Sequence, residues 1–223
     1  MGVPNSTLIR DVKIFTGTEV IERGYVHVLG GVVAEVGEGE YSGELSAGMT
    51  VVSRPGDSVM PGLIGEPPRA ASAGADGVEN NLRFGVTTVY DVGDGPENDG
   101  EVEKVDSDAA KIAASPKDAR PLATQQIDDK PAADADIPYG LRLQLQMRAL
   151  VREAGKAPED VLRSATADAA DRLGLHDRGR IEAERKADIV LVRGDVLEEL
   201  GKEDGKGLPI EAVWRDGVFA SAF

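Results

Sequence analysis

Three short apolar segments of this chain are each followed by acidic side chains, and these carboxylates are the groups best placed to do chemistry. The segments are residues 58–64, 85–92 and 121–127, and their Val, Ile, Leu and Thr content predicts β-strands. Two carboxylates in different surroundings can work as a general acid and a general base, and several together can hold Mg²⁺ or Ca²⁺. We predict a catalytic role for Glu66, Asp91 and Asp128.

Further polar side chains near the same strand ends are predicted to bind a small ligand. They are Arg69, Tyr90, Asp94, Gln125, Asp129 and Tyr139. The alternative is that acidic loops in a chain of net charge −15 are solvated, and that the two tyrosines pack in the core or at its rim. No cofactor is expected, because the run Gly93–Gly95 is too short for a dinucleotide-binding loop.

Alternating and β-branched stretches at both ends of the chain predict the strands that must position these groups. The N-terminal part has the pattern of an antiparallel meander with glycine-containing turns. Strands are predicted at residues 7–14, 20–21 with 25–29, 32–36, 51–53 and 59–60, and near the C-terminus at 187–192 and 210–218.

The helices are predicted between these strand-rich regions. Their expected ranges are residues 70–83, 106–114, 137–151 and 158–173. In the third range, Leu143, Met147, Leu150 and Val151 fall on one apolar stripe, which is typical of a helix packed on a core. The fourth begins at Pro158 with two acidic residues, which favour a helix start, and Gly174 ends it.

A more specific pattern runs through five stretches of the sequence. These are Pro-Gly-Leu-Ile-Gly at 61–65, Gly-Val-Thr-Thr-Val-Tyr-Asp at 85–91, and the runs 158–175, 178–192 and 210–218. Together they resemble the metal-dependent amidohydrolase superfamily, in particular its imidazolonepropionase-like members. The resemblance implies that the first two are the first barrel strands, the third is the helix after the last barrel strand, and the others return the chain to an N-terminal β-sandwich.

The resemblance also implies a metal site, and the matching positions of this sequence lack its ligands. Gly65 stands where the family has Asp, Pro67 where it has the first metal-binding His, and Arg69 where it has the second. Gln125 stands where the family has the Asp of the last strand. The chain has two histidines, both predicted to be structural or solvent-facing, and they are His27 and His176. A zinc site built on imidazole is therefore not expected.

The predicted fold class is α/β plus β. Residues 1–57 and 185–223 are expected to form one composite β-sandwich, and residues 58–184 a reduced (β/α) barrel of about three parallel strands with helices. A closed eight-stranded barrel takes roughly 250 residues, more than this segment supplies. Open strand edges invite pairing with another chain, so we predict a homodimer formed through the open sheet.

Composition excludes several classes of partner. A net charge of −15 argues against nucleic acid and anionic membranes, because both need a basic surface. The absence of cysteine excludes disulfides, thiolate metal sites and a cysteine nucleophile. Residues 1–11 lack the pattern of a signal peptide and no run of about 18 apolar residues occurs, so a cytoplasmic location is expected.

Three functions are open from the sequence. The first is an amidohydrolase-like protein that has lost the metal-hydrolase site and binds a small organic molecule in the remaining cleft, or acts as a scaffold. The second is a metal-independent enzyme of the cyclase, isomerase or lyase type that uses the cleft carboxylates. The third is a metal-dependent hydrolase of C–N bonds, which the resemblance suggests and the residues at its metal positions do not support.

Overall fold

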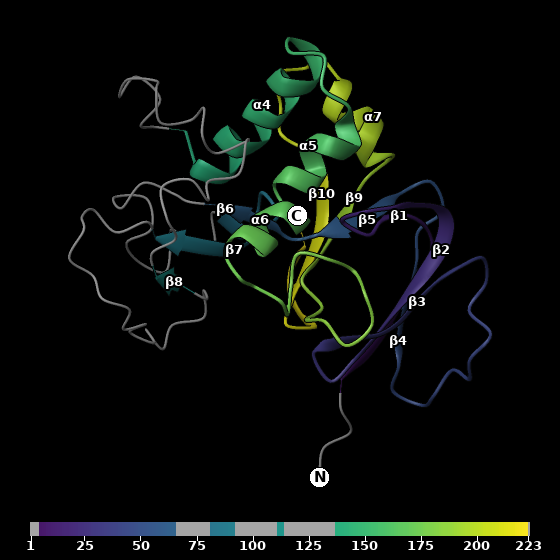
Figure 1. Cartoon of the computed structure of the whole chain (residues 1–223). Coiled ribbons are helices and arrows are strands. Elements are labelled where there is room, and N and C mark those ends of the chain that lie inside the picture. The colour runs from purple at the N-terminus through teal and green to yellow at the C-terminus, as the bar shows by residue number, and fades with distance from the viewer. Residues whose placement is uncertain (1–4, 66–80, 92–110, 114–136, 223) are drawn as a thin grey trace.

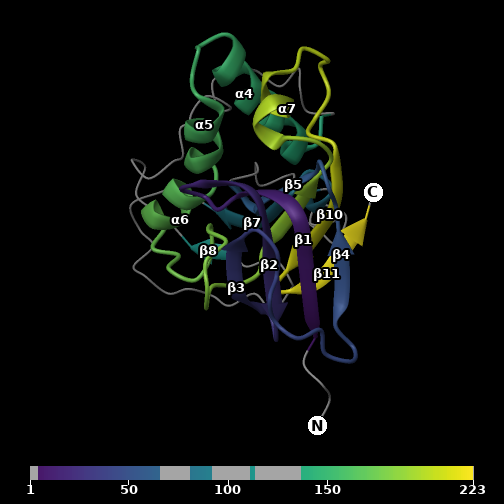
Figure 2. The same ribbon diagram turned by 90° about the vertical axis from the view of Figure 1, so that its right-hand side faces the viewer.

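The computed structural model describes residues 5–65, 81–91, 111–113 and 137–222. Their strands form two sheets, a large mixed one and a small parallel one. The helices α4, α5 and α7 pack on one another and lie together at one end of the sheets in both views (Figure 1 and Figure 2).

The large sheet has eight strands drawn from both ends of the described chain. Its strands are β1 (Ser6–Phe15), β2 (Val20–Leu29), β3 (Val32–Glu38), β4 (Thr50–Ser53), β5 (Ser58–Pro61), β9 (Ile189–Val192), β10 (Ile210–Arg215) and β11 (Val218–Ala222). Their order is β11-β10-β9-β5-β1-β2-β3, with β4 paired to β1 beside this path. The N-terminal strands meet the C-terminal ones where β5 pairs with β9 in antiparallel register. The sequence order therefore brings the two ends of the chain into one sheet.

The predicted meander is confirmed by the pairing of β1 with β2 and of β2 with β3, both antiparallel. Alternation is the reason, since Leu8, Val26 and Val28 lie in the core while the charged residues between the apolar positions face outward. The turns at the ends of two hairpins touch, because Gly31 lies so close to Gly217 that a side chain on Gly217 would meet the backbone of Gly31. Both glycines have positive φ, which a side chain would also strain.

The small sheet contains three parallel strands, β6 (Leu63–Gly65), β7 (Val86–Asp91) and β8 (Lys111–Ala113). The helix predicted over residues 106–114 is wrong at residues 111–113, which form β8. Pairing with Val89, Tyr90 and Asp91 of β7 overrides the local helix propensity of this short stretch. The strand predicted at 121–127 and most of the helix predicted at 70–83 lie outside the described residues.

The C-terminal half carries the helices α4 (Tyr139–Arg152), α5 (Pro158–Ser164), α6 (Ala167–Arg172) and α7 (Val196–Gly201). The apolar stripe of α4 is confirmed, because Leu143, Met147 and Leu150 are buried. The single helix predicted over 158–173 is broken into α5 and α6. The break has a tertiary cause, since the carbonyl of Ala165 accepts a hydrogen bond from the amide of Ile64 in β6 at 2.9 Å.

Two apolar clusters hold these layers together. One lies between the helices and the sheets and includes Met60, Leu63, Leu143, Met147 and Leu162, all fully buried. The other lies within the large sheet and is built mainly from its valines and isoleucines, with Trp214 at 4% exposure. The first cluster fixes α4 and α5 against β6 and β7, which is where the predicted site residues begin.

Candidate functional site

The carboxyl ends of β6 and β7 form the candidate site. The two strands are parallel, and after an irregularity between Leu63 and Ile64 the pairing places Ile64 opposite Thr88 and Gly65 opposite Val89. Their last residues, Gly65 and Asp91, therefore lie at the same end of the small sheet, the end at which its parallel strands finish. In parallel α/β folds ligands and catalytic groups gather at this end of the sheet, which is the location predicted from the sequence, and the site itself stays a prediction.

Tyr139, the first residue of α4, closes the end of β6. Its side chain is 3% exposed and lies directly over Gly65. A Cβ atom added at Gly65 would lie 2.5 Å from the Tyr139 hydroxyl oxygen and 2.8 Å from Cε1 of its ring. Real contacts of a Cβ are not that short, so the phenol occupies the space into which a side chain at position 65 would project.

The structure brings three of the predicted residues to this edge. Tyr139 is at the N-terminus of α4, and Tyr90 and Asp91 are the last two residues of β7, paired with Ile112 and Ala113 of β8. The other predicted residues, catalytic and binding together, lie outside the described residues. They are Glu66, Arg69, Asp94, Gln125, Asp128 and Asp129.

A buried ion pair behind β7 was missed by the sequence analysis. Arg178 and Asp188 are 5% and 4% exposed, and Nη1 of Arg178 lies 3.5 Å from Oδ2 of Asp188. The same Nη1 donates to Oγ1 of Thr88 in β7 at 3.1 Å, while Oδ1 of Asp188 accepts from the backbone amide of Asp216 at 2.9 Å. Arg178 thus joins β7 of the small sheet to Asp188, which lies just before β9 of the large sheet. Asp188 in turn is bonded to the turn between β10 and β11.

The electrostatics of this pair follow from its burial. Burial raises the pKa of the Asp188 carboxyl above its ordinary value, although Arg178 and the Asp216 amide favour the ionised form. Asp177, whose Oδ1 accepts from Nε of Arg178 at 3.2 Å, supplies a second carboxylate to the same guanidinium. The sequence signal is the Arg-Gly-Arg run at 178–180 together with Ala187-Asp188, which the resemblance assigns only to the segment that returns the chain to the sandwich.

The described residues do not fit a metal held by imidazole. His27 lies in β2, where Nε2 is 3.1 Å from Oγ of Ser6, and His176 lies in the loop after α6. Among the residues that the structure describes, no three His, Cys, Asp or Glu side chains come together as a metal site. At the end of β6 itself, Gly65 offers no donor and Tyr139 fills the space above it.

A cavity of about 580 Å³ opens on the large sheet rather than at the strand ends of the small one. Its ionisable lining residues are Asp11, Lys13, Glu22, Arg23, Asp57 and Asp195. Both cations are paired with carboxylates of the lining, since Lys13 pairs with Asp195 at 2.7 Å and with Glu22 at 3.1 Å, and Arg23 pairs with Asp11 at 2.7 Å. The hydrogen bond to Asp195 raises the pKa of Lys13. Mutual pairing favours a structural role for this cluster.

One segment of the chain is similar in sequence to a known family, and nearly all of the chain is similar in fold to solved structures. Residues 127–219 match the model of the amidohydrolase family. No curated protein matches the sequence. Molinate hydrolase has a similar structure, with a TM-score of 0.67 at 11% identity over 99% of this chain and 95% of that one.

Two further solved structures have the same fold. The β-aspartyl dipeptidase of Fervidobacterium islandicum AW-1 has a TM-score of 0.64 at 13% identity, covering 98% of this chain and 97% of that one. The ochratoxinase of A. niger has a TM-score of 0.62 at 11% identity, covering 98% and 96%. The predicted resemblance is thereby confirmed, by sequence over residues 127–219 and by fold over nearly all of the chain. In the part of the chain that the structure describes, no helix is long and apolar enough to span a membrane.

Proposed function

We propose that this amidohydrolase-like chain has lost the metal-hydrolase site of its relatives and binds a small organic molecule at the carboxyl ends of β6 and β7. In this proposal the binding edge belongs to a reduced barrel formed by residues 58–184, attached to a composite sandwich of residues 1–57 and 185–223. The residues assigned to it are those predicted from the sequence, with Tyr139 and Asp91 at its described rim.

The relation between Gly65 and Tyr139 carries the proposal. Position 65 matches the Asp that opens the family's metal motif, and here it is a glycine whose side-chain space is filled by a phenol. A metal ligand could not be restored by changing this residue alone, because the new side chain would collide with Tyr139. In this proposal, α4 packs over the position at which the resemblance implies the first acidic residue of the family's metal motif.

Metal analysis of the purified chain tests the first half of the proposal. We expect zinc and other transition metals well below one equivalent after dialysis, as measured by inductively coupled plasma mass spectrometry. Stoichiometric zinc that survives dialysis would restore the third hypothesis, a metal-dependent hydrolase of C–N bonds, and would overturn this one.

Ligand-observed NMR with a set of small amide fragments tests the second half. Fragments that bind at the strand ends are expected to lose their signal with the native chain and to recover it with Tyr139→Ala. A matched control is Tyr25→Phe, which changes a tyrosine of the large sheet whose hydroxyl donates to Glu35 at 2.6 Å. Binding that survives Tyr139→Ala unchanged, or an absence of binding by any fragment, would contradict a ligand site at this edge.

A metal-independent enzyme is the second candidate, and the placement of Asp91 favours it. Asp91 is the last residue of β7, at the edge where carboxylate catalysis was predicted, together with Asp128 and Glu66. Turnover of any bound fragment that Asp91→Asn abolishes while binding persists would favour this candidate. Binding without turnover in the native chain would favour a binding protein.

A further inference from the structure

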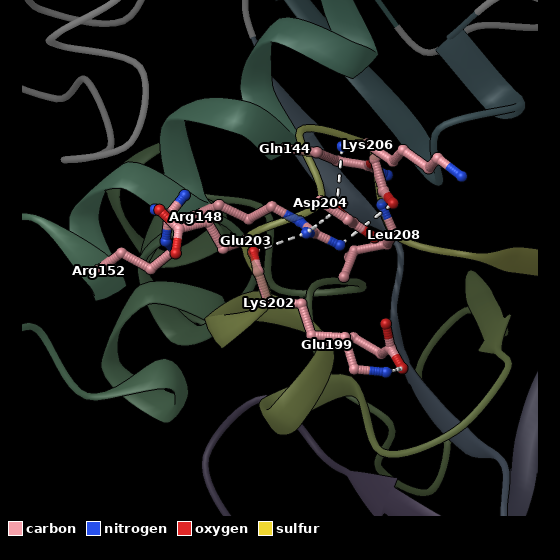
Figure 3. A network of polar contacts seen from close by, with 10 residues as sticks. Gln144, Arg148, Arg152, Glu199, Lys202, Glu203, Asp204, Lys206 and Leu208 are labelled. Atoms are coloured by element: carbon pink, nitrogen blue, oxygen red, sulfur yellow. Dashed lines mark hydrogen bonds and ion pairs between the residues drawn. The ribbon is translucent and has the colours of Figure 1, made fainter.

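Gln144 of α4 connects two segments that are distant in sequence. Its amide is fully buried, and Nε2 donates to the carbonyl of Phe84 at 2.7 Å. Oε1 accepts from the amide of Leu208 at 2.7 Å, and Gln144 and Leu208 are both drawn in Figure 3. Phe84 lies two residues before β7, and Leu208 lies two residues before β10. One side chain therefore ties α4 to the entry of a strand in each sheet.

Arg148, one helical turn further along α4, holds the loop of residues 202–207. Its side chain is 3% exposed, and Nη1 donates to the carbonyl of Lys202 at 2.9 Å and to Oδ1 of Asp204 at 2.5 Å. Nη2 donates to the carbonyl of Gly207 at 3.2 Å. Figure 3 shows the guanidinium directed into the 202–207 loop. These three acceptors all lie within residues 202–207. The described hydrogen bonds of the buried Arg148 guanidinium therefore come from this one loop.

The 202–207 loop owes its conformation to these contacts. Residues 202–206 are exposed, and Gly205 and Gly207 give the loop backbone freedom. Its other described attachments are the ion pair of Glu203 with Arg152 of α4, the ion pair of Lys202 with the buried Glu199 of α7, and the backbone bond from the Lys202 amide to the Glu199 carbonyl. Of these described attachments, the pair of Glu203 with Arg152 reaches α4. Glu203 is exposed and such a pair contributes little to stability, so Arg148 is the main anchor between the loop and α4.

We propose that Arg148 and the 202–207 loop set the position of α4 and thereby hold Tyr139 over Gly65, so that Arg148 is a positioning residue for the strand-end site. Tyr139, Leu143 with Gln144, and Met147 with Arg148 follow the helical repeat on the buried face of α4. From Tyr139 to Arg148 the helix rises by roughly 14 Å at about 1.5 Å per residue. A rigid helix transmits a shift at one of these residues to the other.

The consequence is a coupling between a surface loop and the ligand site. When the loop holds Arg148, the phenol lies against Gly65 at the end of β6, where the ligand is proposed to contact it. When the loop releases Arg148, the first turn of α4 is free to move from β6 and to carry Tyr139 away from the proposed ligand site. The importance of this coupling rests on the proposed function, but the coupling itself requires no ligand to be detected.

Amide hydrogen exchange of the full chain, followed by mass spectrometry, tests the coupling. In Arg148→Met we expect exchange to accelerate about tenfold or more in the first turn of α4 and in residues 63–65, since local opening there becomes easier. The paired strands β1 and β2 should exchange as in the native chain. Arg148→Lys, which keeps a cation beside Asp204, should restore part of the protection, and Arg152→Met, which removes the exposed pair, should change little.

Two results would overturn the inference. Acceleration confined to residues 202–208 would mean that the loop does not control α4. Equal acceleration in all segments, including β1 and β2, would mean that Arg148 stabilises the whole fold and positions nothing in particular. Neither result bears on whether a small molecule binds at the strand ends, which the fragment experiment decides separately.

Discussion

The hydroxyl oxygen of Tyr139 lies 2.5 Å from the point at which a Cβ atom of residue 65 would stand. This contact joins the start of α4 to the last residue of β6 and leaves glycine as the residue that fits at position 65. Side chains in such a packed interior have little room to move aside, so changes on either side of the contact have measurable effects.

Gly65→Ala is expected to lower the free energy of unfolding by about 1–3 kcal/mol, because the methyl group overpacks the space that Tyr139 fills. Urea denaturation followed by circular dichroism measures the change. The control is Gly201→Ala, where a new Cβ meets no atom within 4 Å and stability should be unchanged or slightly higher. Equal stability of Gly65→Ala and the native chain would show that the phenol moves aside freely.

Gln144→Glu is expected to destabilise the fold by about 3 kcal/mol at neutral pH, because an ionised carboxylate would be buried against the carbonyl of Phe84. The carboxyl group should have a raised pKa in the folded state, above its ordinary value of about 4.3. The penalty is therefore complete above the folded pKa and fades as the pH falls toward the unfolded one. Denaturation of variant and native chain at several pH values measures the difference.

Gln146→Glu, two residues along the same helix and partly exposed, is the matched control for that change. Water can solvate a carboxylate at this partly exposed position, so its penalty should be smaller and should vary less with pH than that of Gln144→Glu. If Gln144→Glu were equally mild, the two hydrogen bonds of Gln144 would not contribute to the attachment of α4.

Arg178→Met is expected to cost about 3–5 kcal/mol at neutral pH, because it leaves Asp188 as a buried carboxylate without its cation. Burial already raises the pKa of Asp188 in the native chain, and loss of Arg178 should raise it further. Ionisation then destabilises the folded state above the folded pKa, and the cost disappears as the pH falls toward the unfolded value of about 3.9. Thermal unfolding of both proteins between neutral pH and pH 4 measures this convergence.

Adding Asp188→Asn to Arg178→Met provides the control. The asparagine keeps an oxygen for the amide of Asp216 and removes the uncompensated charge, so the double variant should be more stable than Arg178→Met at neutral pH. A penalty for Arg178→Met that does not change with pH would assign the loss to packing rather than to charge.

We expect the chain to form a homodimer through the open edge of the small sheet at β8. Multi-angle light scattering should give twice the mass of the 23.5 kDa chain. Ile112→Lys introduces a charge into this edge strand and should yield a monomer, because charged residues on edge strands oppose pairing. Val32→Lys, a change in the edge strand β3 of the large sheet, should remain dimeric. A native monomer at high concentration would contradict the prediction.

The elements that sequence analysis located correctly are those whose pattern is local. Alternation identified β1, β2 and β3, and an apolar stripe at helical spacing identified α4. The errors lie where a distant contact decides the conformation. Ala165 ends α5 because its carbonyl is taken by Ile64, and residues 111–113 form a strand because they pair with β7.

The candidate site follows the same division. The carboxylates that follow apolar runs predict a site at the ends of β6 and β7, with Tyr139 among its binding residues, and this location stays a prediction. The packing of Tyr139 against Gly65 could not be predicted from the sequence, because it depends on where α4 docks. The burial of Arg178 could not be predicted either, since an arginine in a polar loop gives no sign that Thr88 and Asp188 will bind it.

The bond from the Ile64 amide to the Ala165 carbonyl also limits how copies of this protein can assemble. Together with the bond from Gly62 to the carbonyl of Asp188, it occupies the backbone donors on the outer side of β6. Of the two edges of the small sheet within the described residues, only that of β8 is left for another strand. We therefore expect copies to meet at β8 of the small sheet, and a contact between two identical edges closes as a pair and does not extend into a filament.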